Sequence, residues 1–405
     1  MEGHRLAERE DNRLDFARRR LEALRRRHLH RHVSPIANGV DPWIEIDGRR
    51  LLNLSSNNYL GLAMHPDVTA AAATAAQALG CGTGASRLIS GTSELHQRLE
   101  TRLARFKNAE SALLFNSGYT ANTGVIPALV GPGDLVLGDE LNHASLIDGC
   151  RLSRAEFHTY AHRDAGALEE QLSRAAHEGR GKRRLVVTDS VFSMDGDLAP
   201  LTEIAALCRS YDALLLVDEA HATGCLGPAG RGLVAHLGLE EDVTVTMSTL
   251  SKAFGGFGAF VTGGSLLIEY LVNVCRGFIF TTALPPTVVA ASLAALDALE
   301  REPEMVERLQ ANGDRLRCGL QKLGFDTLGS ETHIVPVLVG SSDRAMEMAA
   351  NLRQAGVFAV PIRPPTVPMG AARIRVSVMA THTLSDLEFA IAAFENVGKQ
   401  IGIFA

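Results

Sequence analysis

Between Ser111 and Gly264, short apolar runs alternate with longer amphipathic stretches, and this alternation constrains the fold more than any other feature. The apolar runs have the length of strands and read SALLF, DLVLGD, RLVVTDS, ALLLVDEA, VTVTMS and GAFVTG. The stretches between them, GYTANTGVIPALV, HASLIDGCRLS and APLTEIAALCRSY, are typical of helices. This pattern predicts an α/β fold with a mostly parallel sheet covered on both faces. Ligands of such sheets bind beyond the carboxyl ends of the strands.

The sequence on either side of this region predicts two further parts. Residues 1–60 form an N-terminal arm with an arginine-rich helix and the hairpin WIEIDGRRLLNLSS, which contains an Asp-Gly turn. Residues 61–290 form the large domain. After the break at FTTALPP, residues 291–405 contain a long helical segment and the strand candidates HIVPVLVG, GVFAVPI and ARIRVSVM. This last part is predicted to be a smaller α+β domain.

Composition argues against several classes of function. A net charge of −6 gives no reason to expect nucleic acid as a partner. No run reaches the roughly 18 apolar residues that a membrane span needs. The six cysteines are scattered without metal-ligand spacing, which predicts a reduced, cytoplasmic protein without a structural zinc site. Glu8, Glu10 and Asp11 argue against an organelle transit peptide, despite the neighbouring arginines.

The lysines of the chain offer one candidate for amine chemistry. A desolvated lysine can lose its proton and form a Schiff base, whereas arginine stays protonated. Lys252 follows an apolar strand and precedes a run of glycines, which allow the backbone to bend tightly. The other four lie in helical, surface or polar-turn contexts, and they are Lys107, Lys182, Lys322 and Lys399.

Polar residues also follow the neighbouring strands. The run Ser117-Gly118-Tyr119 precedes a helix, where free backbone amides and the helix dipole favour an anion such as phosphate; alternatively, Ser117 is a simple N-cap. Asp218 ends an apolar strand, and a carboxylate buried there needs a cation or hydrogen bonds. Asp189 and Ser190 are the last two residues of the RLVVTDS run. No His/Asp/Glu set at ligand spacing accompanies Asp218, so a metal is not predicted.

Together, an amine, an anion cradle and a buried acid match one cofactor, pyridoxal phosphate (PLP). PLP presents an aldehyde to a lysine, a phosphate to an anion site and a ring nitrogen to an acidic partner. Thr249 is placed to add a hydroxyl to the phosphate site. The glycine-rich run GTGASRLISGT follows a helix and does not complete the dinucleotide motif, so we expect a loop near the active site.

An ordered set of motifs resembles the α-oxoamine synthases, which are fold-type I PLP enzymes, over nearly the whole chain. The motifs are SSNNYLGL, GASRLISGTSELHQRLE, LNHASLIDG, VFSMDGDLAPL, VDEAHATGCLGPAGRG, TLSKAFGG, FTTALPP and IRPPTVPMGAARIRVS. The resemblance implies that Lys252 captures the cofactor aldehyde and later acts as the base on the amino acid α-carbon. It implies that Asp218 pairs with the ring nitrogen and that His143 stacks on the ring.

The same resemblance implies the remaining site residues. His221 and Ser193 bond the phenolic oxygen of the ring, and the backbone amides of Gly118 and Tyr119 bind the phosphate with Thr249. Thr281 or Thr282 of the partner subunit reaches that phosphate, which implies a homodimer. The residues implied for substrate binding are Arg375, as a bidentate clamp for the carboxylate, with Asn57 and Arg25.

The implied activity is a decarboxylative condensation of an amino acid with an acyl thioester. The IRPPTVP run favours the branch of the family that joins L-alanine to a pimeloyl thioester. Other branches use glycine with acetyl-CoA or succinyl-CoA, or serine with a long acyl chain. An aminotransferase and a catalytically silent partner subunit are the more distant alternatives, and Lys252 argues against the silent subunit. The sequence leaves open whether the thioester is free CoA or a carrier protein.

Overall fold

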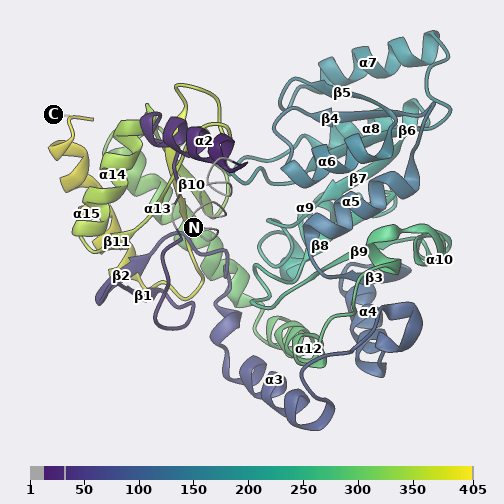
Figure 1. The fold of residues 1–405 in the computed structure, drawn as a ribbon, viewed down its shortest axis with the longest axis horizontal. Helices are drawn as coiled ribbons and strands as arrows, with labels where there is room; N and C mark the ends of the chain where they lie inside the picture. The colour runs from purple at the N-terminus through teal and green to yellow at the C-terminus, as the bar shows by residue number, and fades with distance from the viewer. Residues whose placement is uncertain (1–12, 32, 404–405) are drawn as a thin grey trace, which may run out of the picture.

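The computed structural model describes residues 13–31 and 33–403, so Glu8, Glu10 and Asp11 lie outside the described residues. A seven-stranded sheet forms the centre of a large domain, seen on the right of Figure 1. Its strands are β3 (Ser111–Phe115), β4 (Leu135–Asp139), β5 (Glu156–Tyr160), β6 (Arg184–Asp189), β7 (Leu214–Asp218), β8 (Val245–Thr249) and β9 (Ala259–Gly263). Their order is β3-β9-β8-β7-β6-β4-β5; β9 is antiparallel to both neighbours and the other pairs are parallel. The predicted α/β fold with a mostly parallel sheet is confirmed.

Helices cover both faces of this sheet. They are α4 (Glu94–Phe106), α5 (Gly118–Leu129), α6 (Ala144–Ser153), α7 (Ala165–His177), α8 (Leu201–Ser210), α10 (Ser265–Val274) and α12 (Pro286–Arg301). Side chains of β7 alternate between two cores: Leu215 and Val217 share one with α4, α7, α8 and α12, whereas Leu216 shares the other with α5, α6 and α10. Because both faces are buried, the strands read as continuous apolar runs.

One strand of the large domain, and the helix that comes next along the chain, lie outside the segments that the sequence patterns identify. The strand is β5, at the edge of the sheet, where Glu156, His158 and Thr159 are exposed. Because most of β5 is exposed, it lacks the continuous apolar run that identifies the other strands, and its sequence reads as a loop. The helix is α7, which follows β5 directly.

A smaller body, on the left of Figure 1, contains two three-stranded sheets. The first joins β1 (Trp43–Ile46), β2 (Arg49–Asn53) and β11 (Val357–Phe358), and the second joins β10 (Ile334–Gly340), β13 (Ala372–Ser377) and β12 (Val360–Ile362). The predicted hairpin turns at Asp47 and Gly48, both with positive φ. The predicted single strand GVFAVPI is wrong, because it forms β11 and β12, which belong to different sheets.

Helices complete the smaller body and connect it to the large domain. The long helical segment is interrupted at Pro303, between α12 and α13. The boundary expected at residue 290 falls inside α12, which packs on α3. No described helix is long and apolar enough to cross a membrane. The remaining helices are α2 (Asp15–Arg26), α3 (Pro66–Leu79), α9 (Leu233–His236), α11 (Arg276–Ile279), α13 (Glu304–Lys322), α14 (Ser342–Gln354) and α15 (Leu384–Gln400), with short turns at Leu62–Met64, Arg87–Gly91 and Pro228–Gly230.

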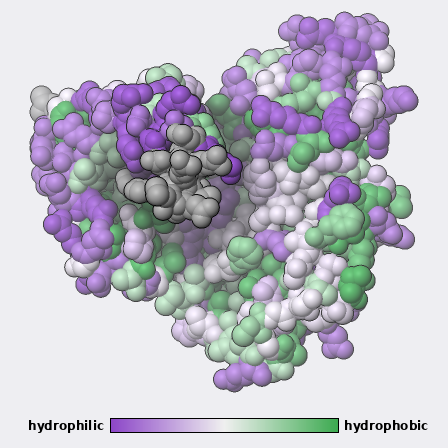
Figure 2. Space-filling model, in the orientation of Figure 1, coloured by the Kyte–Doolittle hydropathy of each residue, from purple (hydrophilic) through white to green (hydrophobic). Residues whose placement is uncertain are grey.

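The molecular surface is hollowed between the large domain and the smaller body (Figure 2). The carboxyl ends of β4, β6 and β7 carry Asp139, Asp189 and Asp218, and the predicted ligand site lies at this end of the sheet. The helix α2, with its strongly hydrophilic surface, lies over the smaller body at the edge of the hollow (Figures 1 and 2).

Candidate active site

A cavity of about 190 Å³ lies beyond the carboxyl ends of the central strands. Its wall combines residues at the carboxyl ends of four strands, β4, β6, β7 and β8, or just after them, with the first residues of α5. The lining residues are Gly118, Tyr119, His143, Ser145, Asp189, Asp218, Ala220, His221, Met247, Thr249, Ser251 and Lys252. Seven of the predicted site residues therefore meet in one cavity: Gly118, Tyr119, His143, Asp218, His221, Thr249 and Lys252.

Lys252 reaches this cavity from a tight loop after β8. Gly255 N donates to the Lys252 carbonyl at 2.9 Å, and Gly256 N donates to Leu250 O at 2.9 Å. Gly255 has φ +64°, and a Cβ there would lie 2.1 Å from Ala63 N, so only glycine fits this turn. The glycine run after Lys252 thus has the role predicted for it: it closes the loop that aims the amine.

The amine of Lys252 is poised to lose its proton. Burial lowers its pKa to about 8, against the opposing charges of Asp218 and Asp189 and with a further contribution from Arg375. Its Nζ lies 3.0 Å from His221 Nε2. Near neutral pH a fraction of the amine is therefore in the nucleophilic, neutral form.

A polar chain connects Lys252 to a buried arginine of the smaller body. His221 is neutral, because burial and the charge of Lys252 lower its pKa well below the usual range. Its Nδ1 lies 2.7 Å from the hydroxyl of Tyr59. That hydroxyl lies 2.9 Å from Asn57 Oδ1 and accepts a longer bond, 3.4 Å, from Arg375. Arg375 also donates from Nε to Ser193 O, at 2.5 Å.

Asp218 is held in place by two hydrogen-bond donors. It accepts hydrogen bonds from Asn122 Nδ2 at 2.8 Å and from the backbone amide of Ala220 at 2.9 Å. Asn122 Nδ2 also bonds Ser145 Oγ at 2.9 Å, and that hydroxyl lies 2.7 Å from His143 Nδ1. A buried carboxylate therefore faces the cavity with its orientation fixed through Asn122.

Two further titratable groups face the cavity beside Asp218. Burial and the neighbouring charge of Asp218 raise the pKa of Asp189 well above its usual value. Asp189 accepts a hydrogen bond from the backbone amide of His143 at 2.7 Å. Burial also lowers the pKa of His143, so its ring is neutral near pH 7.

The first turn of α5 forms another part of the cavity wall. Ser117 is the N-cap, and its hydroxyl accepts from Thr120 N at 3.1 Å. Gly118 and Tyr119 head the helix, where backbone amides have no intrahelical acceptor. The hydroxyls of Thr249 and Ser251, which line the same cavity, lie 2.6 Å apart. Amides and hydroxyls around one space suit a phosphate. The N-cap interpretation of Ser117 is confirmed, and its role in a phosphate site stays a prediction.

Other predicted residues lie away from the cavity lining. The backbone of Ser193 contacts Arg375, and Asn57 is exposed beside Arg375. Arg25 is exposed on α2. Thr281 bonds Gly277 O at 2.7 Å, and Thr282 pairs with Ser86 in an isolated bridge, so the run GTGASRLISGT adjoins these threonines. Their predicted roles stay predictions.

Sequence reasoning assigned no role to four residues that shape the site: Tyr59, Asn122, Ser145 and Asp189. Tyr59 belongs to the motif SSNNYLGL, and Asp189 stands at the end of a strand. The sequence position of each residue could therefore have indicated a role in the site. Asn122 and Ser145 lie on helices α5 and α6, and only the packing of these helices against each other brings them to Asp218.

The comparisons with known proteins agree with this site. The matching family model is described as aminotransferase class I and II and covers residues 49–394. The chain therefore belongs to this family. Among its relatives is the 8-amino-7-oxononanoate synthase of Geobacter sulfurreducens, 52% identical over 386 residues that cover 95% of this chain and 98% of the relative. The predicted resemblance to the α-oxoamine synthases is thereby confirmed.

Solved structures give the same assignment. A serine palmitoyltransferase from S. paucimobilis, with bound PLP-myriocin, matches with a TM-score of 0.91 and 33% identity, covering 97% of this chain and 99% of that chain. An 8-amino-7-oxononanoate synthase from Francisella tularensis matches with a TM-score of 0.74 and 27% identity, covering 87% of this chain and 98% of that chain. The fold is that of the fold-type I PLP transferases.

Proposed function

We propose that this chain is a PLP-dependent acyltransferase that condenses L-alanine with a pimeloyl thioester to give 8-amino-7-oxononanoate, CoA and CO2, a step of biotin biosynthesis. One observation carries the proposal. The amine of Lys252, the carboxylate of Asp218 and the N-terminus of α5 surround one cavity, in a chain half identical to proteins of that name. The serine palmitoyltransferase structure with PLP supports the cofactor.

The residues of the cavity fit PLP group by group. Lys252 would hold the aldehyde, Asp218 the ring nitrogen, and the amides of Gly118 and Tyr119 the phosphate, together with the Thr249 hydroxyl. Ser251, beside Thr249, supplies a further hydroxyl to the same position. When bound, PLP acts as an electron sink for the α-carbon of the amino acid.

The chain's own residues move the proton and orient the substrate. Lys252 Nζ, with its pKa lowered to about 8, would take the proton from the α-carbon of the amino acid and return one to the product. Arg375 would bind the amino acid carboxylate in a bidentate fork, with Asn57 beside it. His221, neutral and 3.0 Å from Lys252, would orient that amine, and His143 would lie against the cofactor ring.

The proposal includes a cytoplasmic homodimer. Segments 85–89 and 280–283 lie side by side through the Ser86–Thr282 bridge, and they expose Ile89 (80%) and Phe280 (69%). Large apolar side chains exposed together are typical of a protein interface. A second copy seated there would place Thr281 or Thr282 of the partner subunit near this cavity. Sedimentation should give twice the chain mass of 43.4 kDa, and a monomer would contradict the dimer.

One specific observation supports a second candidate function. The serine palmitoyltransferases superpose better than the 8-amino-7-oxononanoate synthase structure, with TM-scores of 0.91 and 0.74. A condensation of serine with a long acyl-CoA is therefore the alternative substrate pair.

A substrate panel tests the proposal. The PLP-loaded protein is incubated with alanine, glycine or serine and with pimeloyl, acetyl, succinyl or palmitoyl thioesters, each offered as CoA and as carrier-protein conjugates. We expect alanine with a pimeloyl thioester to release the thiol fastest, and we expect no release from Lys252→Ala. Full turnover by Lys252→Ala would overturn the assignment. Conversion of the cofactor to its amine form without thiol release would indicate an aminotransferase.

A further inference from the structure

The 190–198 loop, which follows β6, lies between the large domain and the smaller body. An isolated bridge between Val191 and Leu198 closes it into a tight turn. Gly196, at its tip, has φ +70°, and an added Cβ would lie 2.0 Å from Ile334 O of β10. The loop therefore packs without spare room against the smaller body.

Several hydrogen bonds and an ion pair tie the loop to the smaller body. Ser193 O accepts the hydrogen bond from Arg375 Nε at 2.5 Å, and Asp195 forms an ion pair with Arg373. Gly196 O accepts from Thr332 Oγ1 at 3.0 Å. The position of Arg375 thus depends on where this loop lies.

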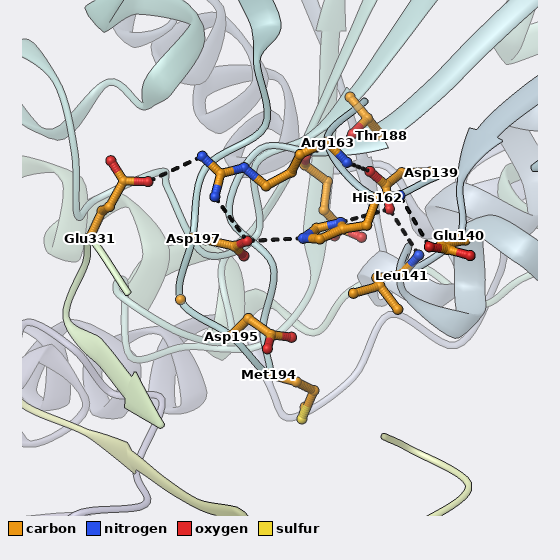
Figure 3. A network of polar contacts seen from close by, with 12 residues as sticks. Asp139, Glu140, Leu141, His162, Arg163, Thr188, Met194, Asp195, Asp197 and Glu331 are labelled. Atoms are coloured by element: carbon orange, nitrogen blue, oxygen red, sulfur yellow. Dashed lines mark hydrogen bonds and ion pairs between the residues drawn. The ribbon is translucent and has the colours of Figure 1, made fainter. Parts of the chain in front are cut away.

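His162, after β5, ties the same loop to the large domain (Figure 3). Its Nε2 lies 2.9 Å from Asp197 Oδ2, and its Nδ1 lies 2.9 Å from Asp139 Oδ1 at the end of β4. The ring packs edge-on against Phe192, with centroids 4.4 Å apart. Arg163 supports the arrangement, bonding Asp197 at 3.3 Å and Glu331 at 3.4 Å. His162 is therefore sandwiched between the sheet and the loop.

The two carboxylates require a charged ring. An ionised carboxylate only accepts, so both nitrogens of His162 must donate, and only the imidazolium has two N–H groups. Burial alone would lower the pKa of His162, but the hydrogen bonds to Asp139 and Asp197 raise it to about 9. Glu140 also lies beside the ring, and its side chain accepts a hydrogen bond from His162 N at 3.1 Å. The other titratable or charged groups around the ring are Tyr160, Arg163 and Glu331.

We propose that His162 is a positioning residue for amino acid binding: its imidazolium locks the 190–198 loop to the large domain and, through the Ser193 carbonyl, holds Arg375 in place. This inference rests on the proposed function only in giving Arg375 the amino acid carboxylate. A neutral ring can donate to one of the two carboxylates but not to both, so deprotonation opens the lock.

The kinetic signature separates positioning from chemistry. His162 does not line the cavity around Lys252, so proton transfer should be retained once the substrate is bound. Loss of one hydrogen bond to a charged group corresponds to roughly a tenfold change in affinity. His162→Gln should therefore raise the KM for the amino acid about tenfold and change kcat by less than about threefold.

The pH profile gives a second signature. In the wild-type enzyme the KM for the amino acid should rise near about pH 9, because the pKa of His162 is reached there and the ring loses its charge. His162→Gln should lack this rise. Asp197→Asn removes one of the two carboxylates, so the rise should move to lower pH. A merely structural histidine would not shift the profile in this way.

The experiment measures amino acid KM and kcat of the holoenzyme across pH, and hydrogen–deuterium exchange in peptides that span residues 190–198. The matched control is His158→Gln, an exposed histidine of β5 that bonds Glu156 at 2.8 Å and should behave as wild type. Raised KM and faster exchange in His162→Gln, with a shifted profile in Asp197→Asn, would support the lock.

Unchanged KM and unchanged exchange in His162→Gln would overturn it, as would a wild-type pH profile in Asp197→Asn. If the wild-type protein condenses no amino acid with any thioester, the proposed function fails, and the exchange measurement alone decides whether His162 fixes the loop. If His162→Gln does not fold, Asp197→Asn decides the question.

Discussion

Replacing Lys107 by methionine should leave a buried carboxylate without its cation. The sequence placed Lys107 in a helical or surface context, but its side chain is only 3% exposed and forms an ion pair with Glu219, which is fully buried. Lys107 also contacts Thr223 Oγ1 at 3.2 Å and the carbonyl of Arg231. Glu219 retains one further donor, Val234 N at 2.8 Å. Breaking a buried pair on one side typically costs about 3–5 kcal/mol.

The expected loss of stability is set by the least costly way to neutralise the buried carboxylate, which is to protonate it. Protonating a glutamate of ordinary pKa about 4.3 costs about 3.7 kcal/mol at pH 7, at 1.36 kcal/mol per pH unit, and about 1 kcal/mol at pH 5. We therefore predict that Lys107→Met lowers the free energy of unfolding by about 3–4 kcal/mol at pH 7 and by much less at pH 5. The sign follows because a folded state that binds an extra proton becomes less stable as the pH rises.

Urea unfolding followed by circular dichroism, at both pH values, measures the loss. Lys107→Met combined with Glu219→Gln should recover at least half of it, because no buried charge remains. The matched control is Lys399→Met, whose pair with Glu395 is exposed and should contribute less than about 0.5 kcal/mol. A loss below about 1 kcal/mol at pH 7, or one of equal size at pH 5, would refute the reasoning.

Three further predictions concern the cavity. Gly255→Ala should cost at least about 2 kcal/mol, because the left-handed φ and the contact with Ala63 both resist a Cβ. Calorimetry against Gly238→Ala, a position with a similar φ of +67° but open space around it, isolates the contact, and equal losses would contradict it. Asn122→Ala removes the amide that orients Asp218, so kcat should fall about 10- to 100-fold; wild-type turnover would show that Asp218 needs no such support. The rate of PLP uptake by the cofactor-free protein should rise with pH and reach half its maximum near about 8, the lowered pKa of Lys252, whereas an ordinary lysine would reach half-maximum near about 10.4. Stopped-flow absorbance measures this rate, and a midpoint near the ordinary value would count against a desolvated amine.

Sequence patterns predict the parts of this molecule that depend on local order. Each apolar run from SALLF to GAFVTG is a strand, because strands buried on both faces need continuous apolar residues. Lys252, Asp218, His143 and the head of α5 were found because each follows a strand, and parallel strands bring such positions to one edge of the sheet.

Contacts between distant segments could not be predicted in the same way. Asn122 reaches Asp218 across 96 positions of sequence, and His162 reaches Asp197 across 35, with no spacing rule that connects either pair. The burial of Lys107 depends on a carboxylate 112 residues away. The proposed role of Thr281 or Thr282 depends on a second copy of the chain, which no pattern within one chain positions.

One measurement tests the central claim most directly: borohydride reduction of the PLP-loaded protein, followed by peptide mass analysis. If the amine of Lys252 captures the cofactor aldehyde, reduction should fix the cofactor covalently on the peptide that contains Lys252, and Lys252→Ala should remain unlabelled. A loaded protein that gives no adduct, or an adduct at Lys107 or Lys182 instead, would contradict the account.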